Sequence, residues 1–126
     1  YYKSKYNNFN LTFIDLGEFK EINDNFGHEA GDQALIEVSK FLLTLFCDSF
    51  VCRYGGDEFI ILSTINGFNL KKPLNREINI YGNAFNIQIH FGTAEYPKDG
   101  DCLESMIKVA DKIMYDHKVG TKQNGR

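Results

Sequence analysis

The sequence of 126 residues is long enough for a hydrophobic core, and we expect a single domain over residues 1–126. Hydrophobic residues make up 43% of the chain and charged residues 25%, which is typical of a globular protein. The net charge of −3 argues against a general binder of nucleic acids or membrane surfaces, because such proteins are usually basic. No apolar run approaches the roughly 20 residues that cross a bilayer, so we expect no direct membrane contact from this fragment. A membrane-anchored parent protein remains compatible with the sequence.

Cysteine usage predicts a reducing compartment. The cysteines are odd in number and lack the spacing of metal ligands. They are Cys47, Cys52 and Cys102. We therefore expect reduced thiols and a cytoplasmic location, and Cys52, inside an apolar run, is most simply a core residue.

The first part of the chain predicts a strand and two helices. Asn10–Asp15 is typical of a buried strand that ends in an acid. A helix that ends at Gly27, in its C′ position, is expected next. Its apolar face consists of Phe19, Ile22 and Phe26. A second helix is expected from about Gly31 or Asp32. Its apolar residues are Leu35, Val38, Phe41, Leu42 and Leu45.

Two β-prone runs on either side of the stretch Arg53–Phe59 predict a hairpin. The runs are Phe50–Cys52 and Phe59–Leu62. The Gly55-Gly56 pair is expected to make the turn, because glycine takes the positive φ angles that a tight turn requires. The turn also carries two acids, Asp57 and Glu58. Side chains alternate between the faces of a strand, so one carboxylate can point into a cleft, as a cation site would require.

The rest of the chain predicts a polar loop, a second hairpin and a final helix. The loop covers residues 66–75, and the hairpin turns at Gly82–Asn83 between strands of alternating polarity. The final helix is expected to begin at Asp101, with Glu104 as a capping-box partner, and to end at Gly120. The order of elements predicts an α+β layer fold in which helices cover a largely antiparallel sheet.

Asp15 and Asp57 lie at the ends of two segments that are expected to be neighbours. If these strands pair, with backbones roughly 5 Å apart, both carboxylates can bind one ion. Carboxylate oxygens suit Mg²⁺, which leaves room for substrate phosphates, and the helix start after Asp15 attracts anions. Lys20, in the first turn of that helix, adds a positive charge. These residues predict a metal–triphosphate site, with a strand-end cap at Asp15 and a solvated Lys20 as the alternative.

Several motifs follow one another in order along the chain. They are Asp15-Leu16-Gly17-Glu18-Phe19-Lys20, Ile22-Asn23-Asp24, Gly27-His28, Gly31-Asp32, Arg53-Tyr54-Gly55-Gly56-Asp57-Glu58-Phe59, Phe91-Gly92-Thr93-Ala94 and Ala110-Asp111-Lys112-Ile113-Met114-Tyr115. From Leu11 onward this pattern resembles the GGDEF domain of the diguanylate cyclase family. The resemblance implies a ferredoxin-like, palm-like sheet related to nucleotidyl cyclases. The family's leading helix, before the first strand, is absent from this fragment.

The resemblance also implies an activity. Two GTP molecules would be condensed into cyclic di-GMP with release of pyrophosphate, with Mg²⁺ or Mn²⁺ as the metal. A homodimer would be needed for turnover, because each site holds one GTP, and no nucleic acid would take part. The family further suggests a fused sensory or phosphodiesterase domain, so the chain is expected to be a fragment of a larger protein.

The resemblance assigns the metal ligands and the reacting groups. The side chains of Asp15 and Asp57 and the Leu16 carbonyl would bind Mg²⁺, and two metals there would stabilise the attacking and leaving oxygens. Asp57 would also accept the proton of the attacking 3′-hydroxyl. Lys20 would offset charge on the phosphates, and Glu58 is the remaining residue predicted to be catalytic.

The nucleotide contacts are implied in the same way. Asn23 and Asp32 would read the guanine edge with an amide and a carboxylate, and His28 would contact the nucleotide nearby. Lys118 would reach the terminal phosphates, with Lys122 in place of the family's arginine. The other predicted nucleotide-binding residues are Glu18, Phe19, Gly55 and Gly56.

Several of these residues also have a structural interpretation. Taken singly, Asn23 is a helix-end residue, His28 a helix-cap residue and Asp32 the N-cap of the long helix. The residues interpreted as structural or non-catalytic are Asp111, Tyr115, His90 and His117.

Two departures from the family pattern affect the predicted domain. Gly17 stands where the family usually has a second acid, so the loop after the first strand is expected to be looser. Between Leu62 and Ile78 a family helix is shortened or missing, which would leave one face of the sheet less covered.

Three functions can be compared with these observations. An active diguanylate cyclase explains why the metal acids, Lys20 and the guanine pair are all present. A degenerate GTP-binding module that regulates a neighbouring domain, such as a phosphodiesterase, is favoured by Gly17, the missing helix and the altered C-terminal lysines. A dimerisation scaffold would leave the acids and the guanine pair unexplained.

Overall fold

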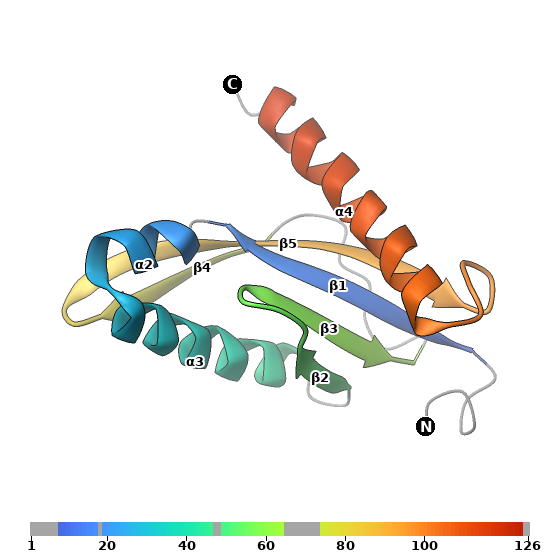
Figure 1. Cartoon of the computed structure of the whole chain (residues 1–126), viewed down its shortest axis with the longest axis horizontal. Helices are drawn as coiled ribbons and strands as arrows, with labels where there is room; N and C mark the ends of the chain where they lie inside the picture. The colour runs from blue at the N-terminus through green and yellow to red at the C-terminus, as the bar shows by residue number, and fades with distance from the viewer. Residues whose placement is uncertain (1–7, 18, 47–48, 65–73, 125–126) are drawn as a thin grey trace.

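The protein is built on one antiparallel sheet with helices on both faces (Figure 1). The computed structural model describes residues 8–17, 19–46, 49–64 and 74–124, with the backbone alone at residue 74 and residues 117–124. The strands are β1 (Phe9–Gly17), β2 (Phe50–Arg53), β3 (Glu58–Ser63), β4 (Leu74–Ile80) and β5 (Asn83–Tyr96). The helices are α2 (Phe19–Phe26), α3 (His28–Leu45) and α4 (Leu103–Asn124).

β1 lies at the centre of the sheet. The strand order is β2-β3-β1-β5-β4, and each pairing between these strands is antiparallel. β1 therefore pairs with β3 along one side and with β5, a strand of 14 residues, along the other. The α+β fold predicted from the order of elements, with helices covering a largely antiparallel sheet, is confirmed.

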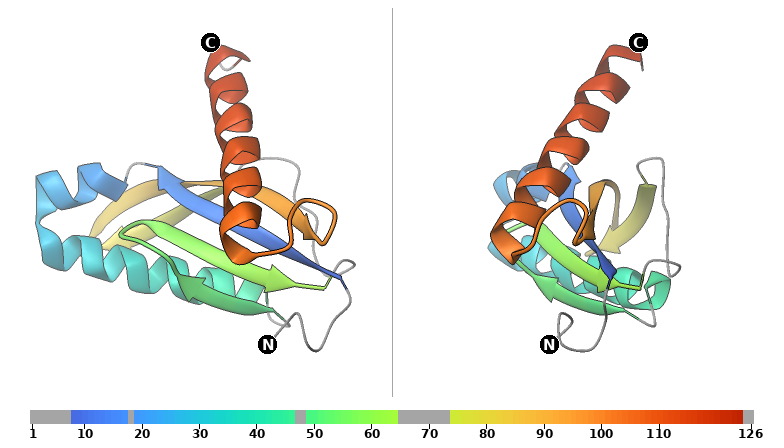
Figure 2. Two further views of the ribbon diagram at one scale, coloured as in Figure 1. Left: turned by 45° about the vertical axis from the view of Figure 1, so that its right-hand side comes forward. Right: turned by 90° about the vertical axis from the view of Figure 1, so that its right-hand side faces the viewer.

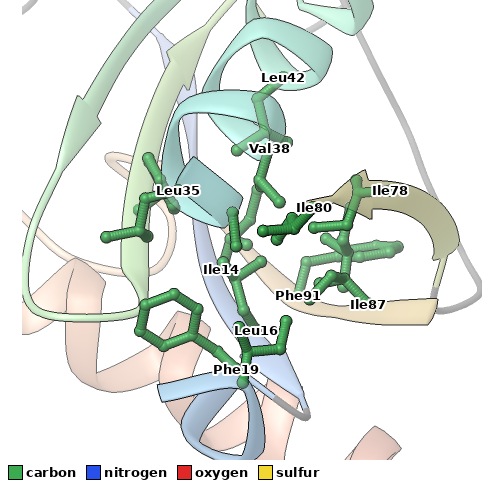
Figure 3. Packing of buried hydrophobic residues seen from close by; sticks show 14 of the residues in the cluster. Ile14, Leu16, Phe19, Leu35, Val38, Leu42, Ile78, Ile80, Ile87 and Phe91 are labelled. Atoms are coloured by element: carbon green, nitrogen blue, oxygen red, sulfur yellow. The ribbon is translucent and has the colours of Figure 1, made fainter. Parts of the chain in front are cut away.

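Alternation along the strands divides the core between the two faces of the sheet. Residues that pack under α2 and α3 include Ile14, Leu16, Phe19, Leu35, Val38, Leu42, Ile78, Ile80, Ile87 and Phe91 (Figure 3). Residues that pack against α4 on the other face include Phe9, Leu11, Phe13, Ile60, Ala94, Met106, Ala110 and Met114. Phe13 and Ile14 are sequence neighbours in different clusters, because successive side chains of a strand point to opposite faces.

Gly92 on β5 lets α4 approach the sheet closely. A Cβ on Gly92 would collide with the Ala110 carbonyl oxygen and would lie 2.6 Å from the Met114 backbone nitrogen. Both obstacles are backbone atoms, which cannot turn aside as a side chain can. From this contact the C-terminal part of α4 stands away from the sheet (Figure 2). The contact also sets where Asp111, the residue after Ala110, lies relative to the central strands.

A single residue separates α2 from α3. Gly27 has a φ of 90°, in the left-handed region that favours glycine, and it follows the last residue of α2 as predicted. The same glycine is the N-cap of α3, which begins at His28. The predicted helix start at Gly31 or Asp32 is therefore wrong. Asp32 lies inside the helix and is not its N-cap, so that structural interpretation of its carboxylate is also wrong.

The final helix begins and ends later than predicted. α4 starts at Leu103, and Ser105 rather than Glu104 makes the capping contact, because its Oγ accepts the Cys102 N–H at 3.4 Å. The helix also continues past Gly120. A glycine in a helix interior costs only about 1 kcal/mol relative to alanine, which the rest of the helix can offset.

The second hairpin turns one residue earlier than predicted. β4 ends at Ile80 and β5 begins at Asn83, so the turn residues are Tyr81 and Gly82. Their φ angles are 52° and 84°, which suits a two-residue turn between strands of right-handed twist.

Some predictions concern residues outside this description. The expected loss of a family helix falls on residues 65–73, which are not described, so it stays a prediction. Of the cysteines that are described, Cys52 and Cys102 carry free thiols, and Cys52 packs half-buried against the α4 face. Within the described part of the chain, no helix combines the length and the apolar character needed to span a bilayer.

Candidate functional site

β1 and β3 bring acids from two distant parts of the sequence to one end of the sheet. Asp15 on β1 is the cross-strand partner of Glu58, the first residue of β3. One residue further on, the Leu16 N–H donates to the Asp57 carbonyl oxygen at 3.1 Å. The predicted pairing of the Asp15 strand with the hairpin strand is therefore confirmed, and the Asp15 and Asp57 segments lie about one strand spacing apart.

Negative charge accumulates at this end of the sheet. Burial raises the pKa of the Glu58 carboxyl above its ordinary value, and the charges of Asp15, Asp57 and Asp111 raise it further. All three aspartates are therefore close enough to Glu58 to disfavour another negative charge there. A bound cation would relieve this repulsion. Asp111 comes from α4, and the sequence interpretation of it as purely structural missed its electrostatic contribution to this site.

The donor set fits a hard divalent cation. Mg²⁺ prefers oxygen ligands, and it is usually held by one or two carboxylates while it keeps water or substrate phosphates as its other ligands. Asp15 and Asp57 match that requirement, and the predicted third ligand, the Leu16 carbonyl, belongs to the residue that pairs with Asp57. Among the described residues, no three His, Cys, Asp or Glu side chains form a complete metal cage. Water or nucleotide phosphates would therefore complete the coordination of the ion.

Arg53 holds the turn that carries Asp57. Its guanidinium Nε donates to the Gly55 and Gly56 carbonyl oxygens at 3.0 and 3.2 Å, and its Nη2 donates to the Gly56 oxygen at 2.9 Å. Tyr54 and Gly55 donate their N–H groups to the Glu58 carbonyl oxygen at 2.8 and 3.3 Å. The sequence analysis did not single out Arg53. An arginine two residues before a glycine pair was the available sign, because its fork of donors suits adjacent carbonyls.

The two glycines of this turn do not have the backbone conformation that was predicted for them, and their predicted nucleotide contact stays a prediction. Neither Gly55 nor Gly56 has the positive φ that was expected. A Cβ on Gly55 would lie 2.5 Å from Glu58 Oε1, so this glycine leaves room for the Glu58 carboxylate. A Cβ on Gly56 would meet nothing within 4 Å, so no protein atom requires a glycine there.

Asn23 and Asp32, the predicted guanine-reading pair, come from two helices that pack together. The Asn23 side-chain oxygen occupies the space where a Cβ on Gly31 would lie. Gly31 directly precedes Asp32 on α3, so the fold brings the two predicted residues to neighbouring positions. His28 is exposed at the first position of α3, one helical turn before Asp32.

A groove of about 400 Å³ runs beside Asp32, between α3 and Arg53 at the end of β2. It is lined by Asp32, Leu35, Ile36, Ser39, Lys40, Leu43 and Arg53. Small-molecule sites typically have this size and combine apolar walls with a few polar groups. Asp32 and Arg53 therefore share a groove, although they are far apart in the sequence.

The remaining predicted residues divide into exposed, buried and undescribed ones. Lys20 is exposed in the first turn of α2. The Phe19 side chain is 8% exposed and belongs to the core, so only its backbone can meet a ligand. Glu18 and the side chains of Lys118 and Lys122 lie outside the described part of the structure, and their roles stay predictions.

Comparison with known proteins gives relatives in sequence and in structure. Diguanylate cyclase A of Treponema denticola is 34% identical over 127 residues, which cover 92% of this chain and 33% of that protein. Cyclic di-GMP phosphodiesterase NbdA of Pseudomonas aeruginosa is 31% identical over 125 residues, covering 92% of this chain and 16% of that protein. The chain thus spans a third or less of the length of these relatives.

A solved structure agrees with the sequence relatives. A sensory box/GGDEF family protein from Caulobacter crescentus superposes with a TM-score of 0.75 at 28% identity, over 90% of this chain and 80% of that one. The sequence model of the family described as "Diguanylate cyclase, GGDEF domain" matches residues 2–124. The chain therefore belongs to the GGDEF domain family of diguanylate cyclases.

Proposed function

We propose that this chain is a diguanylate cyclase domain that condenses two GTP molecules into cyclic di-GMP and pyrophosphate. The observation that carries the proposal is the junction of β1 with the central hairpin, where Leu16 N–H donates to the Asp57 carbonyl oxygen beside the Asp15–Glu58 pair. That junction supports a shared cation site between residues that are about 40 positions apart in the sequence. The excess negative charge around Glu58 supports the same site.

In this proposal each residue has a defined part. Asp15, Asp57 and the Leu16 carbonyl hold Mg²⁺ or Mn²⁺, which supplies Lewis-acid stabilisation of phosphate charge when bound. Asp57 accepts the proton of the attacking 3′-hydroxyl, whose oxygen bonds to the α-phosphorus of the second GTP as pyrophosphate leaves. Lys20 offsets the charge of the phosphates. Lys118 and Lys122 are proposed to reach the terminal phosphates.

Base selection is proposed to depend on Asn23 and Asp32. A carboxylate accepts from the N–H donors of guanine, and an amide can both donate and accept. Adenine would leave these groups unpaired, which costs binding free energy. The groove beside Asp32 supports this assignment, because its volume of about 400 Å³ is in the range of small-molecule sites. Calorimetry should therefore detect GTP binding in the presence of Mg²⁺ and markedly weaker binding of ATP.

Turnover is proposed to need a homodimer, since each domain binds one GTP. The test is to fuse the chain to a dimerising coiled coil, incubate it with GTP and Mg²⁺, and follow cyclic di-GMP by chromatography. Product that disappears when Mg²⁺ is chelated supports the proposal. GTP binding without product in the forced dimer would contradict cyclase activity.

The second candidate is a GTP-binding module that regulates a fused domain without turnover. Gly17, in place of the family's second acid, favours it. The similarity to a protein named as a cyclic di-GMP phosphodiesterase, of which the match covers only 16%, is compatible with such a fusion. A cytoplasmic location and a fused sensory or phosphodiesterase domain are part of both candidates.

A further inference from the structure

His90 on β5 lies in the same cross-strand row as the proposed metal ligand on β1. Asp15 is the direct partner of His90 in the β1–β5 ladder and of Glu58 in the β1–β3 ladder. Directly opposed residues of antiparallel strands point to the same face, with Cβ atoms about 4.5–5.5 Å apart. The three residues therefore form one row across the centre of the sheet. Residues an even number of positions apart on a strand share a face. Phe13 is two residues from Asp15, Ala94 is four from His90, and both pack against α4, so the row lies on the α4 face.

The imidazole of His90 is buried beside Gly17. The residue is only 6% exposed and is one of few polar residues that are buried among those described. A Cβ on Gly17 would lie 3.2 Å from His90 Nε2 and 3.2 Å from the Gln88 Cβ. The ring therefore extends past Asp15 along β1 and reaches the space that a side chain at position 17 would need. The imidazole can therefore occupy this position only because residue 17 has no side chain.

We propose that His90 is a positioning residue for the Asp15 carboxylate, with its imidazole seated in the space that Gly17 leaves beside β1. The inference rests on the proposed metal site and deepens it. Carboxylates that bind metals are themselves oriented by neighbouring donors, and loss of such a donor typically costs 10- to 100-fold in metal affinity. His90 acts through Asp15, because the described residues contain no three-residue metal cage in which it could take part.

This assignment changes the meaning of two features of the sequence. His90, interpreted as non-catalytic because no motif partner was visible, has Asp15 as its partner across the ladder. Gly17, interpreted as a loosening of the loop after β1, is instead the last residue of β1 and makes room there for a buried ring. A larger side chain at position 17 is therefore expected to fit only when His90 is replaced by a smaller residue.

The test measures Mn²⁺ binding by the purified chain without nucleotide, from the loss of the free-ion EPR signal. His90→Ala is expected to weaken Mn²⁺ binding by about 10-fold or more, and His90→Gln, which keeps an N–H donor, to recover part of the loss. Gln88→Ala is the matched control, since Gln88 also borders Gly17 but lies outside the row of Asp15. Its Mn²⁺ affinity is expected to match that of the parent chain. Thermal unfolding of each variant is recorded beside the titration.

A double-mutant cycle tests the inference a second way, and Gly17→Ala in the parent chain keeps it testable if His90→Ala folds poorly. Gly17→Ala crowds the ring without removing it and is expected to weaken Mn²⁺ binding in the parent. In the His90→Ala background the same change should have a smaller effect, because only the contact with Gln88 remains. Equal effects of Gly17→Ala in both backgrounds, or parent-like binding by His90→Ala, would overturn the inference.

The proposed function can fail separately from this inference. Asp57→Ala removes a proposed metal ligand and is expected to abolish Mn²⁺ binding. If Asp57→Ala behaves in that way while His90→Ala binds like the parent, only the role of His90 is refuted. If the parent chain binds no Mn²⁺, both the metal site and the role of His90 are refuted.

Discussion

The two hairpins of this protein reach tight reversals by different physical means. The β4–β5 turn uses backbone conformation alone, with Tyr81 and Gly82 both at positive φ. The β2–β3 turn uses no positive φ at its glycines and is held instead by the Arg53 side chain, which donates to two carbonyl oxygens of the turn. A turn of the first kind only connects strands. A turn held by a side chain also ties Asp57 to a groove-lining residue, and this difference is what we expect of a functional loop.

The largest difference in GTP turnover is expected between variants that lose a polar side chain from one hairpin or from the other. Asp57→Ala is expected to abolish Mg²⁺-dependent GTP turnover, because the change removes both a proposed metal ligand and the proposed proton acceptor. Asn83→Ala, at the start of β5 beside the other turn, should leave turnover unchanged. The measurement is cyclic di-GMP formation by the forced dimer. Product formation by Asp57→Ala at the parent rate would refute the assigned role.

The glycines of the two turns should respond in opposite ways to alanine. In Gly55→Ala the new Cβ displaces the Glu58 carboxylate, which lies 2.5 Å from its position. That side chain can turn aside, so the variant should lose activity with little change in the free energy of unfolding. The new Cβ of Gly82→Ala meets no neighbour, but residue 82 must keep a φ of 84°. The variant should therefore be less stable by about 1–2 kcal/mol, with its activity unchanged. Parallel denaturant titrations and turnover assays decide, and matching effects of the two variants would contradict this distinction.

The arginines of the two hairpins offer a smaller contrast. Arg53→Lys loses the fork of donors to the turn, because an ammonium is a point charge and cannot reproduce it. We expect a several-fold fall in turnover and a stability loss of only about 0.5 kcal/mol, since the hydrogen bonds are exposed. Arg76 lies 4.9 Å over the Phe41 ring, and Arg76→Lys keeps that cation near the ring. Its turnover should be that of the parent, and an equal loss in both variants would show that Arg53 has no special part.

The smallest expected effect is a dependence of stability on pH. The folded-state pKa of Glu58 lies above its ordinary value of 4.5, with burial as the main cause. Just above that value the folded protein therefore binds more protons than the unfolded chain, so the free energy of unfolding falls as the pH rises through this window. Glu58→Gln should remove this fall, and Glu77→Gln on β4 is the matched control. Urea unfolding at several pH values measures the free energy of unfolding. If its dependence on pH were the same in Glu58→Gln as in the parent chain, the prediction would be contradicted.

Elements that depend on local pattern could be predicted from the sequence. Leu35, Val38 and Leu42 repeat with the helical period, and Ile78 and Ile80 alternate as in a half-buried strand; all five are buried as expected. Gly27 was recognised as a helix end because its chemistry is local. The α3 start was missed because the same glycine also caps the next helix, and no pattern before Gly31 marked that second role.

Contacts between distant segments could not be predicted in this way. Asp111 approaches Glu58 only because α4 packs against Gly92, and the helical pattern of α4 carries no information about where it crosses the sheet. The His90–Asp15 pair depends on the β1–β5 register, which the sequence analysis did not assign. The pairing of β1 with the hairpin was predicted because the two acid motifs required it.

The central claim is that the Asp15 and Asp57 carboxylates share a divalent cation beneath a bound purine triphosphate. A crystal structure of the chain with Mn²⁺ and a non-hydrolysable GTP analogue, with anomalous data at the manganese edge, tests it directly. We expect an anomalous peak within about 2.5 Å of an oxygen from each carboxylate, with phosphate oxygens completing the coordination. A nucleotide bound with no such peak, or a manganese that contacts only one of these aspartates, would contradict it.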